Sequence, residues 1–171
     1  MTRPTFVDTN VFVYARDARE TSKRSMARSW IERLWRERRG RTSIQVLNEC
    51  YFTLTRKIRP AVPNDEAWDY VRELFAWDPC ALDADLGSAA REIERRYRLN
   101  WWDSLVVAAA QAQQCAVLLT EDLSDRAVYG GVTVRNPFNL TVSDAVLEYG
   151  GAPIPRPYRP RGRPRRLKAL G

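Results

Sequence analysis

Four acidic residues lie in apolar surroundings in a chain that contains no histidine. Asp8 follows the apolar segment TFV, Glu49 lies within SIQVLNECYF, Asp103 begins WWDSLVVAAA, and Asp122 ends AVLLTED. A carboxylate in a segment that enters the core is costly unless a partner or a cation compensates its charge. If the fold brings the four together, their repulsion favours protonation or requires a cation. Because histidine is absent, that cation should be a hard ion bound by oxygen, such as Mg²⁺ or Mn²⁺.

Each of these acids, taken alone, also has a simpler interpretation. Asp8 could cap the helix that follows its strand, a role that aspartate favours. Asp103 could complement the dipole of a helix from its first turn, and Asp122 could begin a turn. Glu49 lies off the apolar stripe of its helix, which favours a solvated glutamate. The individual residues therefore leave both interpretations open.

The apolar periodicity predicts the elements that must position these acids. Thr21 or Ser22 is expected to cap a helix that Gly40 ends. Strands alternating with helices indicate an α/β fold with a mainly parallel sheet, in which ligands bind at the carboxyl ends of strands. Asp8 and Asp122 both lie at such ends. The strands are expected at residues 5–9, 80–82, 116–120 and 132–136, and the helices at 21–39, 44–60, from 64 onward, 84–98 and 102–113.

Composition limits the class of protein. A chain of 171 residues with 44% hydrophobic residues can bury the core of one domain. No stretch approaches the roughly 20 apolar residues that span a bilayer, and the start of the chain lacks the pattern of a signal peptide. The three cysteines form no CxxC pair, which argues against a zinc knuckle or a disulfide framework and favours a reducing cytoplasm.

Taken together and in order, the motifs resemble a known family. VDTN near the amino terminus, a glutamate in a mid-chain helix, WWDSLVVAAA and LLTED resemble the PIN-domain ribonucleases, and most closely the VapC toxins of bacterial toxin–antitoxin pairs. This resemblance covers roughly residues 5–140. It implies a three-layer α/β/α fold and a metal-dependent endoribonuclease that uses Mg²⁺ or Mn²⁺. It also implies an RNA substrate, an antitoxin protein as partner, a homodimer, and a cytoplasmic location without a membrane.

The same resemblance assigns roles to residues of this chain. The acidic quartet corresponds to Asp8, Glu49, Asp103 and Asp122. Asp8 and Asp103 are expected to be the principal metal ligands, with Asp122 completing the site. Glu49 would bind directly or through water and help to orient the nucleophile. The polar residues that flank the site would be Asn10 and Thr120, whereas Glu121 is expected to point away. Asp125 could supply a further carboxylate, but a role as a loop or helix cap is favoured.

The net charge of +7 is concentrated in one segment. Seven of the 28 basic residues and none of the 21 acidic ones lie in residues 149–171, so the remainder of the chain is neutral. We therefore divide the chain into a nuclease domain, residues 1–148, and a basic Pro/Arg-rich tail, residues 149–171, that is expected to be flexible. The arginines expected to contact RNA phosphates are Arg156, Arg159, Arg161, Arg163, Arg165 and Arg166.

Two other interpretations of the tail remain open. It could be a solubilising end without a specific role, or one of its arginines could fold back onto the acidic pocket. Deleting residues 152–171 separates the three interpretations, because RNA affinity falls, nothing changes, or basal activity rises.

The tryptophans are expected mainly to pack against other protein residues and not to stack on bases. Trp30, Trp35 and Trp68 lie on predicted amphipathic faces and indicate core or dimer contacts. Of Trp101 and Trp102, one is expected to pack inward while the other faces the rim of the pocket. Stacking on an RNA base is the less favoured role for this pair.

Two other functions are compatible with parts of the sequence. A haloacid-dehalogenase-like phosphatase also places an aspartate after its first strand, but it needs a second aspartate where this chain has Asn10. It also needs a downstream lysine, and the chain offers only Lys23, Lys57 and Lys168. A degenerate PIN module that binds nucleic acid without cutting it is the non-enzymatic alternative. Metal-dependent cleavage of RNA distinguishes all three.

Overall fold

The computed structural model describes residues 3–140. Its strands are β1 (Thr5–Val7), β2 (Gly40–Arg41), β3 (Val117–Leu119), β4 (Val128–Tyr129) and β5 (Val132–Arg135). Its α-helices are α1 (Thr9–Tyr14), α2 (Thr21–Glu37), α3 (Ile44–Phe52), α4 (Asn64–Glu73), α5 (Ala84–Tyr97) and α6 (Trp101–Ala112). A π-helical turn, η1 (Thr53–Lys57), extends α3, and a 3₁₀ turn, η2 (Leu74–Trp77), extends α4.

The strands form one sheet in the order β2-β1-β3-β5-β4. The pairs β1–β2, β1–β3 and β3–β5 are parallel, and only the edge strand β4 runs antiparallel to β5. In the register of β1 and β3, Val7 lies opposite Leu119. The two strands therefore end side by side, and the residues that follow them meet at one edge of the sheet.

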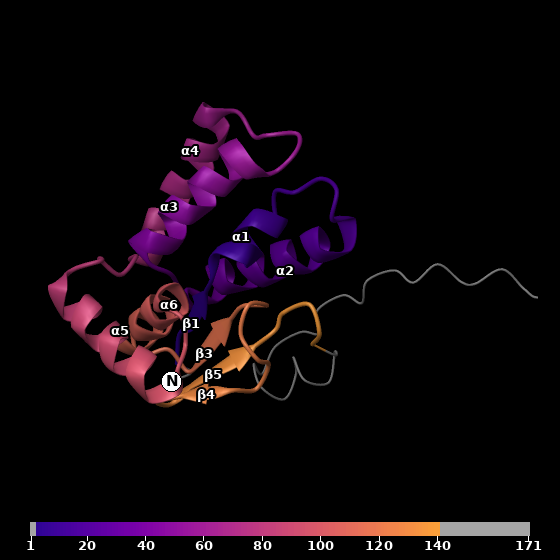
Figure 1. Cartoon of the computed structure of the whole chain (residues 1–171). Helices are drawn as coiled ribbons and strands as arrows, with labels where there is room; N and C mark the ends of the chain where they lie inside the picture. The colour runs from indigo at the N-terminus through magenta and orange to yellow at the C-terminus, as the bar shows by residue number, and fades with distance from the viewer. Residues whose placement is uncertain (1–2, 141–171) are drawn as a thin grey trace, which may run out of the picture.

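Helices cover both faces of the sheet. Figure 1 shows α5 and α6 on one side and α1 and α2 on the other, with α3 and α4 projecting beyond the sheet as an arm. The sheet is buried between these layers, as a parallel sheet requires: Phe6, Leu118 and Val134 are fully buried. The expected three-layer α/β/α fold with a mainly parallel sheet is confirmed.

Side-chain caps account for several helix starts. Ser43 accepts a hydrogen bond from the Val46 amide to begin α3, and Asp83 accepts one from the Leu86 amide to begin α5. The start of α2 differs from the prediction, because Thr21 is already helical and Glu20, which precedes it, makes no side-chain cap.

Two expected elements differ from the structure, and two short strands were not expected. The helix expected over residues 44–60 is regular only to Phe52 and then widens into a π-helical turn. The strand expected at 80–82 is a single bridge between Cys80 and Ser43. The short edge strands β2 and β4 were not predicted, because two-residue strands carry no alternation that a pattern could detect.

Candidate active site

Asp8 connects β1 to α1 at the carboxyl end of the sheet. Its side chain is only 7% exposed. Oδ1 accepts a hydrogen bond from the Thr9 amide at 2.7 Å and so caps α1, while Oδ2 accepts one from Thr120 Oγ1 at 2.8 Å. The capping role that the sequence allowed is therefore real, and the second oxygen faces the neighbouring strand end.

Thr120 is fully buried and is the centre of a hydrogen-bond network. Besides donating to Asp8, its hydroxyl accepts from Asn10 Nδ2 at 2.9 Å and from the Asp122 amide at 3.1 Å. A hydroxyl has one donor and two acceptor sites, so this one is fully used. Asn10 Nδ2 also donates to Asp122 Oδ2 at 3.0 Å. The structure thus brings Asp8, Asn10, Thr120 and Asp122 together as one unit.

Glu49 reaches this unit from α3. Its Oε2 accepts a hydrogen bond from Thr9 Oγ1 at 3.2 Å, and its Oε1 accepts one from Gln45 Nε2 at 2.9 Å. Gln45 lies one helical turn before Glu49, where side chains on a helix meet. The glutamate is half-buried, whereas its position off the apolar stripe had suggested a fully solvated side chain.

Asp103 lies in the first turn of α6. Asn100 caps this helix: its Oδ1 accepts a hydrogen bond from the Asp103 amide at 2.9 Å, and its Nδ2 donates to Asp103 Oδ2. Such reciprocal bonding over three residues resembles a capping box. The buried residues that follow, such as Leu105 and Val107, hold this helix end against the core.

Two hollows meet at these acids. One has a volume of about 660 Å³ and is lined by Glu49, Asp103 and Asp122, among others. The other has a volume of about 320 Å³ and shares Glu49 and Asp122, with Asn10 on its wall. Asp8 lines neither hollow, but Thr120 links it to Asp122, which lines both.

The pKa of Asp8 depends on acids from other segments of the chain. Burial raises the pKa of Asp8 from its ordinary value of 3.8 to about 7, and the charges of Asp122 and Glu49 add to the rise. The hydrogen bonds from Thr120 and Thr9 oppose it.

The pKa of Asp103 is raised by the same two kinds of cause, burial and neighbouring charge. Burial raises its pKa, the hydrogen bond from Asn100 lowers it, and the charges of Asp122 and Glu49 raise it further. The charges of Glu49 and Asp122 therefore raise the pKa of both Asp8 and Asp103. A cation that neutralised the four carboxylates would relieve these repulsions.

The chemistry of the donors fits a hard cation. Carboxylate, hydroxyl and amide oxygens are the ligands that Mg²⁺ and Mn²⁺ take in proteins. Asn10 Oδ1 is moreover buried without a hydrogen-bond partner among residues 3–140. Within the same residues, no three Asp, Glu, His or Cys side chains are close enough to hold a metal ion as they stand. Several of the carboxylate oxygens are instead engaged by Thr9, Asn100 and Thr120.

Two neighbouring acids have other partners. Glu121 accepts hydrogen bonds from Tyr14 Oη at 2.6 Å and from Lys23 Nζ at 2.7 Å. Asp125 accepts from Arg135 Nε at 3.2 Å and from the Asn136 amide at 2.8 Å. These bonds hold both carboxylates outside the quartet. The six tail arginines predicted to bind RNA lie outside the described residues.

The tryptophans only partly follow their predicted roles. Trp30 is fully buried, but Trp35 and Trp68 are 38% and 48% exposed. The prediction that Trp101 or Trp102 packs inward is wrong, because both are exposed and it is Leu105 and its neighbours that fill the core side of α6.

Sequence reasoning missed three residues that hold the acids. For Asn100 and Gln45 a signal existed, namely their spacing of three residues before Asp103 and four before Glu49. Thr9 gave no signal, since its contact with Glu49 joins residues 40 positions apart.

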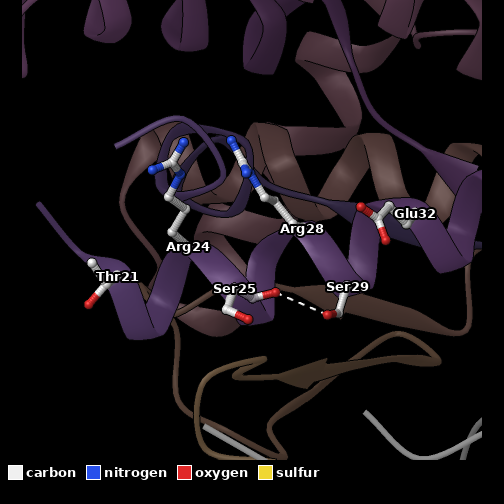
Figure 2. Close-up of a pocket in the computed structure, with 6 residues that line it drawn as sticks. All are labelled: Thr21, Arg24, Ser25, Arg28, Ser29 and Glu32. Atoms are coloured by element: carbon white, nitrogen blue, oxygen red, sulfur yellow. Dashed lines mark hydrogen bonds between the residues drawn. The ribbon is translucent and has the colours of Figure 1, made fainter. Parts of the chain in front are cut away.

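A further hollow, of about 350 Å³, lies along α2. Figure 2 shows Arg24 and Arg28 projecting to the same side of the helix, with Ser29 Oγ donating to the Ser25 carbonyl at 3.0 Å. The described residues that line this hollow all come from α2, and the quartet is not among them.

Comparisons with known proteins found one matching family model and similar solved structures. The VapC20 toxin of Mycobacterium tuberculosis, described as cleaving the sarcin–ricin loop, is similar in structure, with 20% sequence identity and a TM-score of 0.48. The match covers 69% of this chain and 89% of the toxin. No curated protein matches the sequence. The model of the PIN domain matches residues 5–129, well over half of the chain. The chain therefore belongs to the PIN-domain family.

Proposed function

We propose that this PIN-domain protein is a metal-dependent endoribonuclease and the toxin of a toxin–antitoxin pair. The observation that carries the proposal is the meeting of acids from separate segments at the carboxyl ends of β1 and β3. Asp8 and Asp122 share Thr120 as a hydrogen-bond partner, and Glu49 is tied to the same corner through Thr9. A cluster of carboxylates in a solvent-reached hollow has a negative electrostatic potential that repels an anionic substrate. It can bind such a substrate only if a cation reverses that potential.

Asp8, Asp103 and Asp122 would hold the Mg²⁺ or Mn²⁺, with Glu49 beside them. When bound, such an ion would neutralise the acids, bind phosphate oxygens and lower the pKa of a bound water.

The residues of this chain have separate tasks in the proposal. Thr120 fixes one oxygen of Asp8, and Asn10 fixes one oxygen of Asp122. Gln45 and Thr9 each hold one oxygen of Glu49, which lines both hollows and would orient the attacking water. Because the chain has no histidine, a pair of imidazoles cannot serve as acid and base.

The proposed partners are an RNA substrate and an antitoxin protein, with a homodimer as the working assembly in the cytoplasm. They follow from the resemblance to VapC toxins. No helix within residues 3–140 is long and apolar enough to cross a membrane.

The alternatives are weaker. A phosphatase of the haloacid-dehalogenase type would need an aspartate at Asn10, whose amide here binds Thr120 and Asp122. A PIN module that binds without cutting has no use for four acids gathered at one edge of the sheet.

The test is incubation of the purified protein with RNA in Mg²⁺ or Mn²⁺, with EDTA as the control. We expect internal cuts that leave 5′-phosphate and 3′-hydroxyl ends and that cease in EDTA. Intact RNA under every metal condition would favour the non-cutting module.

A further inference from the structure

Large apolar side chains are exposed around the hollow of about 660 Å³ beside the acids. Trp102 at the start of α6 is 61% exposed, Phe52 at the end of α3 is 54% exposed, and Leu82 before α5 is 52% exposed. All three line the same hollow, although they come from separate segments. Scattered apolar residues on a surface need no explanation, but apolar residues grouped around one hollow indicate a binding surface.

A cation lies on the same wall. Lys57 lines the hollow, and its Nζ is 5.5 Å from the centroid of the Phe52 ring. In the part of the chain that the structure describes, no carboxylate forms an ion pair with Lys57. The hollow therefore combines flat aromatic faces, a positive charge available to a ligand, and the carboxylates of the proposed active site.

We infer that this hollow binds an unpaired nucleobase next to the phosphate that is cut, with Trp102 and Phe52 as stacking surfaces. The inference rests on the proposed ribonuclease function and deepens it by naming the residues of this chain that would hold a base beside the cut. A nucleobase offers a planar π-face to an exposed aromatic ring, but in a duplex both faces are covered by neighbouring bases. Lys57 would contact a phosphate of the same strand.

The placement of the rings favours a nucleotide over a peptide. Trp102 immediately precedes Asp103, and Phe52 lies one helical turn after Glu49. A base held by either ring keeps its own phosphate within the acidic region, which gives the rings a role in positioning as well as in affinity. The exposed amide of Asn48, on the same wall, can hydrogen-bond a base edge.

The experiment measures binding of a short single-stranded RNA that carries the fluorescent base 2-aminopurine. The full-length Asp8→Asn protein, in Mg²⁺, prevents cleavage during the measurement. Into it we introduce Trp102→Ala, Trp102→Phe or, as a matched control, Trp68→Ala. Trp68 is 48% exposed and packs against Tyr51 and Phe75, outside the hollow.

Stacking predicts quenching of 2-aminopurine on binding. Trp102→Ala should lose the quenching and weaken binding on the order of tenfold, whereas Trp102→Phe and Trp68→Ala should retain both. A duplex RNA, or one with an abasic site in place of 2-aminopurine, should bind equally to the proteins with and without Trp102→Ala. Because Trp102 is mostly exposed, we expect all variants to fold, which circular dichroism checks.

Unchanged affinity and quenching in Trp102→Ala would overturn the inference, and this is also the result expected if the rings dock a protein partner. Failure of the proposed function looks different. In that case the protein without substitutions leaves RNA intact in Mg²⁺ or Mn²⁺, whatever the binding measurement shows.

Discussion

Thr120 donates its hydroxyl proton to Asp8 Oδ2 at 2.8 Å, across the parallel pair β1 and β3. The contact joins residues 112 positions apart in the sequence, and it is buried. The same hydroxyl accepts from Asn10 and from the Asp122 amide, so it fixes two of the four acids relative to each other. We regard Thr120 as the residue that positions Asp8 relative to Asp122.

Thr120→Val should therefore impair the protein in two ways. Removing the hydroxyl leaves buried polar groups without a partner, which costs about 1–3 kcal/mol in the free energy of unfolding. It also removes a hydrogen bond that lowers the pKa of Asp8, so the pH profile of RNA cleavage should move to higher pH. Denaturant unfolding and cleavage rates across pH measure the two effects.

Thr5→Val is the matched control. Thr5 is a fully buried strand residue whose hydroxyl has no partner among residues 3–140. Its replacement should leave stability unchanged or slightly higher and should not move the pH profile. Equal behaviour of the two variants would show that Thr120 has no positioning role.

Asp8 should make the metal-free protein less stable as the pH rises. Its pKa is about 7 in the fold and 3.8 in an ordinary environment, so the folded state binds the extra proton between these values. Stability is therefore highest below the ordinary pKa, falls as the pH rises through this window, and levels off above the folded pKa. A shift of this size corresponds to at most about 4 kcal/mol.

Asp8→Asn should abolish this part of the pH dependence and stabilise the metal-free protein at pH 8. Urea unfolding in EDTA at several pH values is the measurement. Asp69→Asn is the control, because Asp69 is exposed in α4 and forms an ion pair only with Arg72 among the described residues. In this variant the free energy of unfolding should depend on pH as it does in the protein without substitutions. If the free energy of unfolding of Asp8→Asn depends on pH as steeply as that of the protein without substitutions, ionisation of Asp8 costs the fold little stability.

A pair of glycines tests the packing at the β2 edge. A Cβ on Gly40 would lie 2.5 Å from the Trp77 ring, whereas a Cβ on Gly87 in α5 would meet nothing within 4 Å. Gly40→Ala should destabilise the protein by about 1–3 kcal/mol through overpacking. Gly87→Ala should instead stabilise it by roughly 0.5–1 kcal/mol, because alanine is the better helix former. Thermal unfolding compares them, and a stable Gly40→Ala protein would mean that the ring moves easily.

The sequence predicted most of the fold because its main signals are local. Helices such as α2 and α5 carry apolar residues at helical spacing, and β3 is a short apolar run between polar segments. The strands β2 and β4, with two residues each, are defined by pairing with neighbours and not by their own pattern.

The sequence could indicate which acids form the candidate site, but not the side-chain contacts that hold them. Asp8 and Asp122 follow apolar strands, which a pattern can detect. The bond from Thr9 to Glu49 and the exposure of Trp102 depend on how α1, α3 and α6 pack, and tertiary packing leaves no local trace. The tail arginines lie beyond the described residues, so their role stays a prediction.

The most direct test of the site is the rate of RNA cleavage in Mg²⁺ or Mn²⁺ for Asp8→Asn and Asp103→Asn beside Asp69→Asn. If Asp8 and Asp103 serve one metal-dependent centre, both of the first two variants should lose activity by roughly a hundredfold or more while remaining folded. Asp69→Asn should cut like the unmodified protein. Full activity in Asp8→Asn and Asp103→Asn would contradict the assignment of the quartet as the catalytic site.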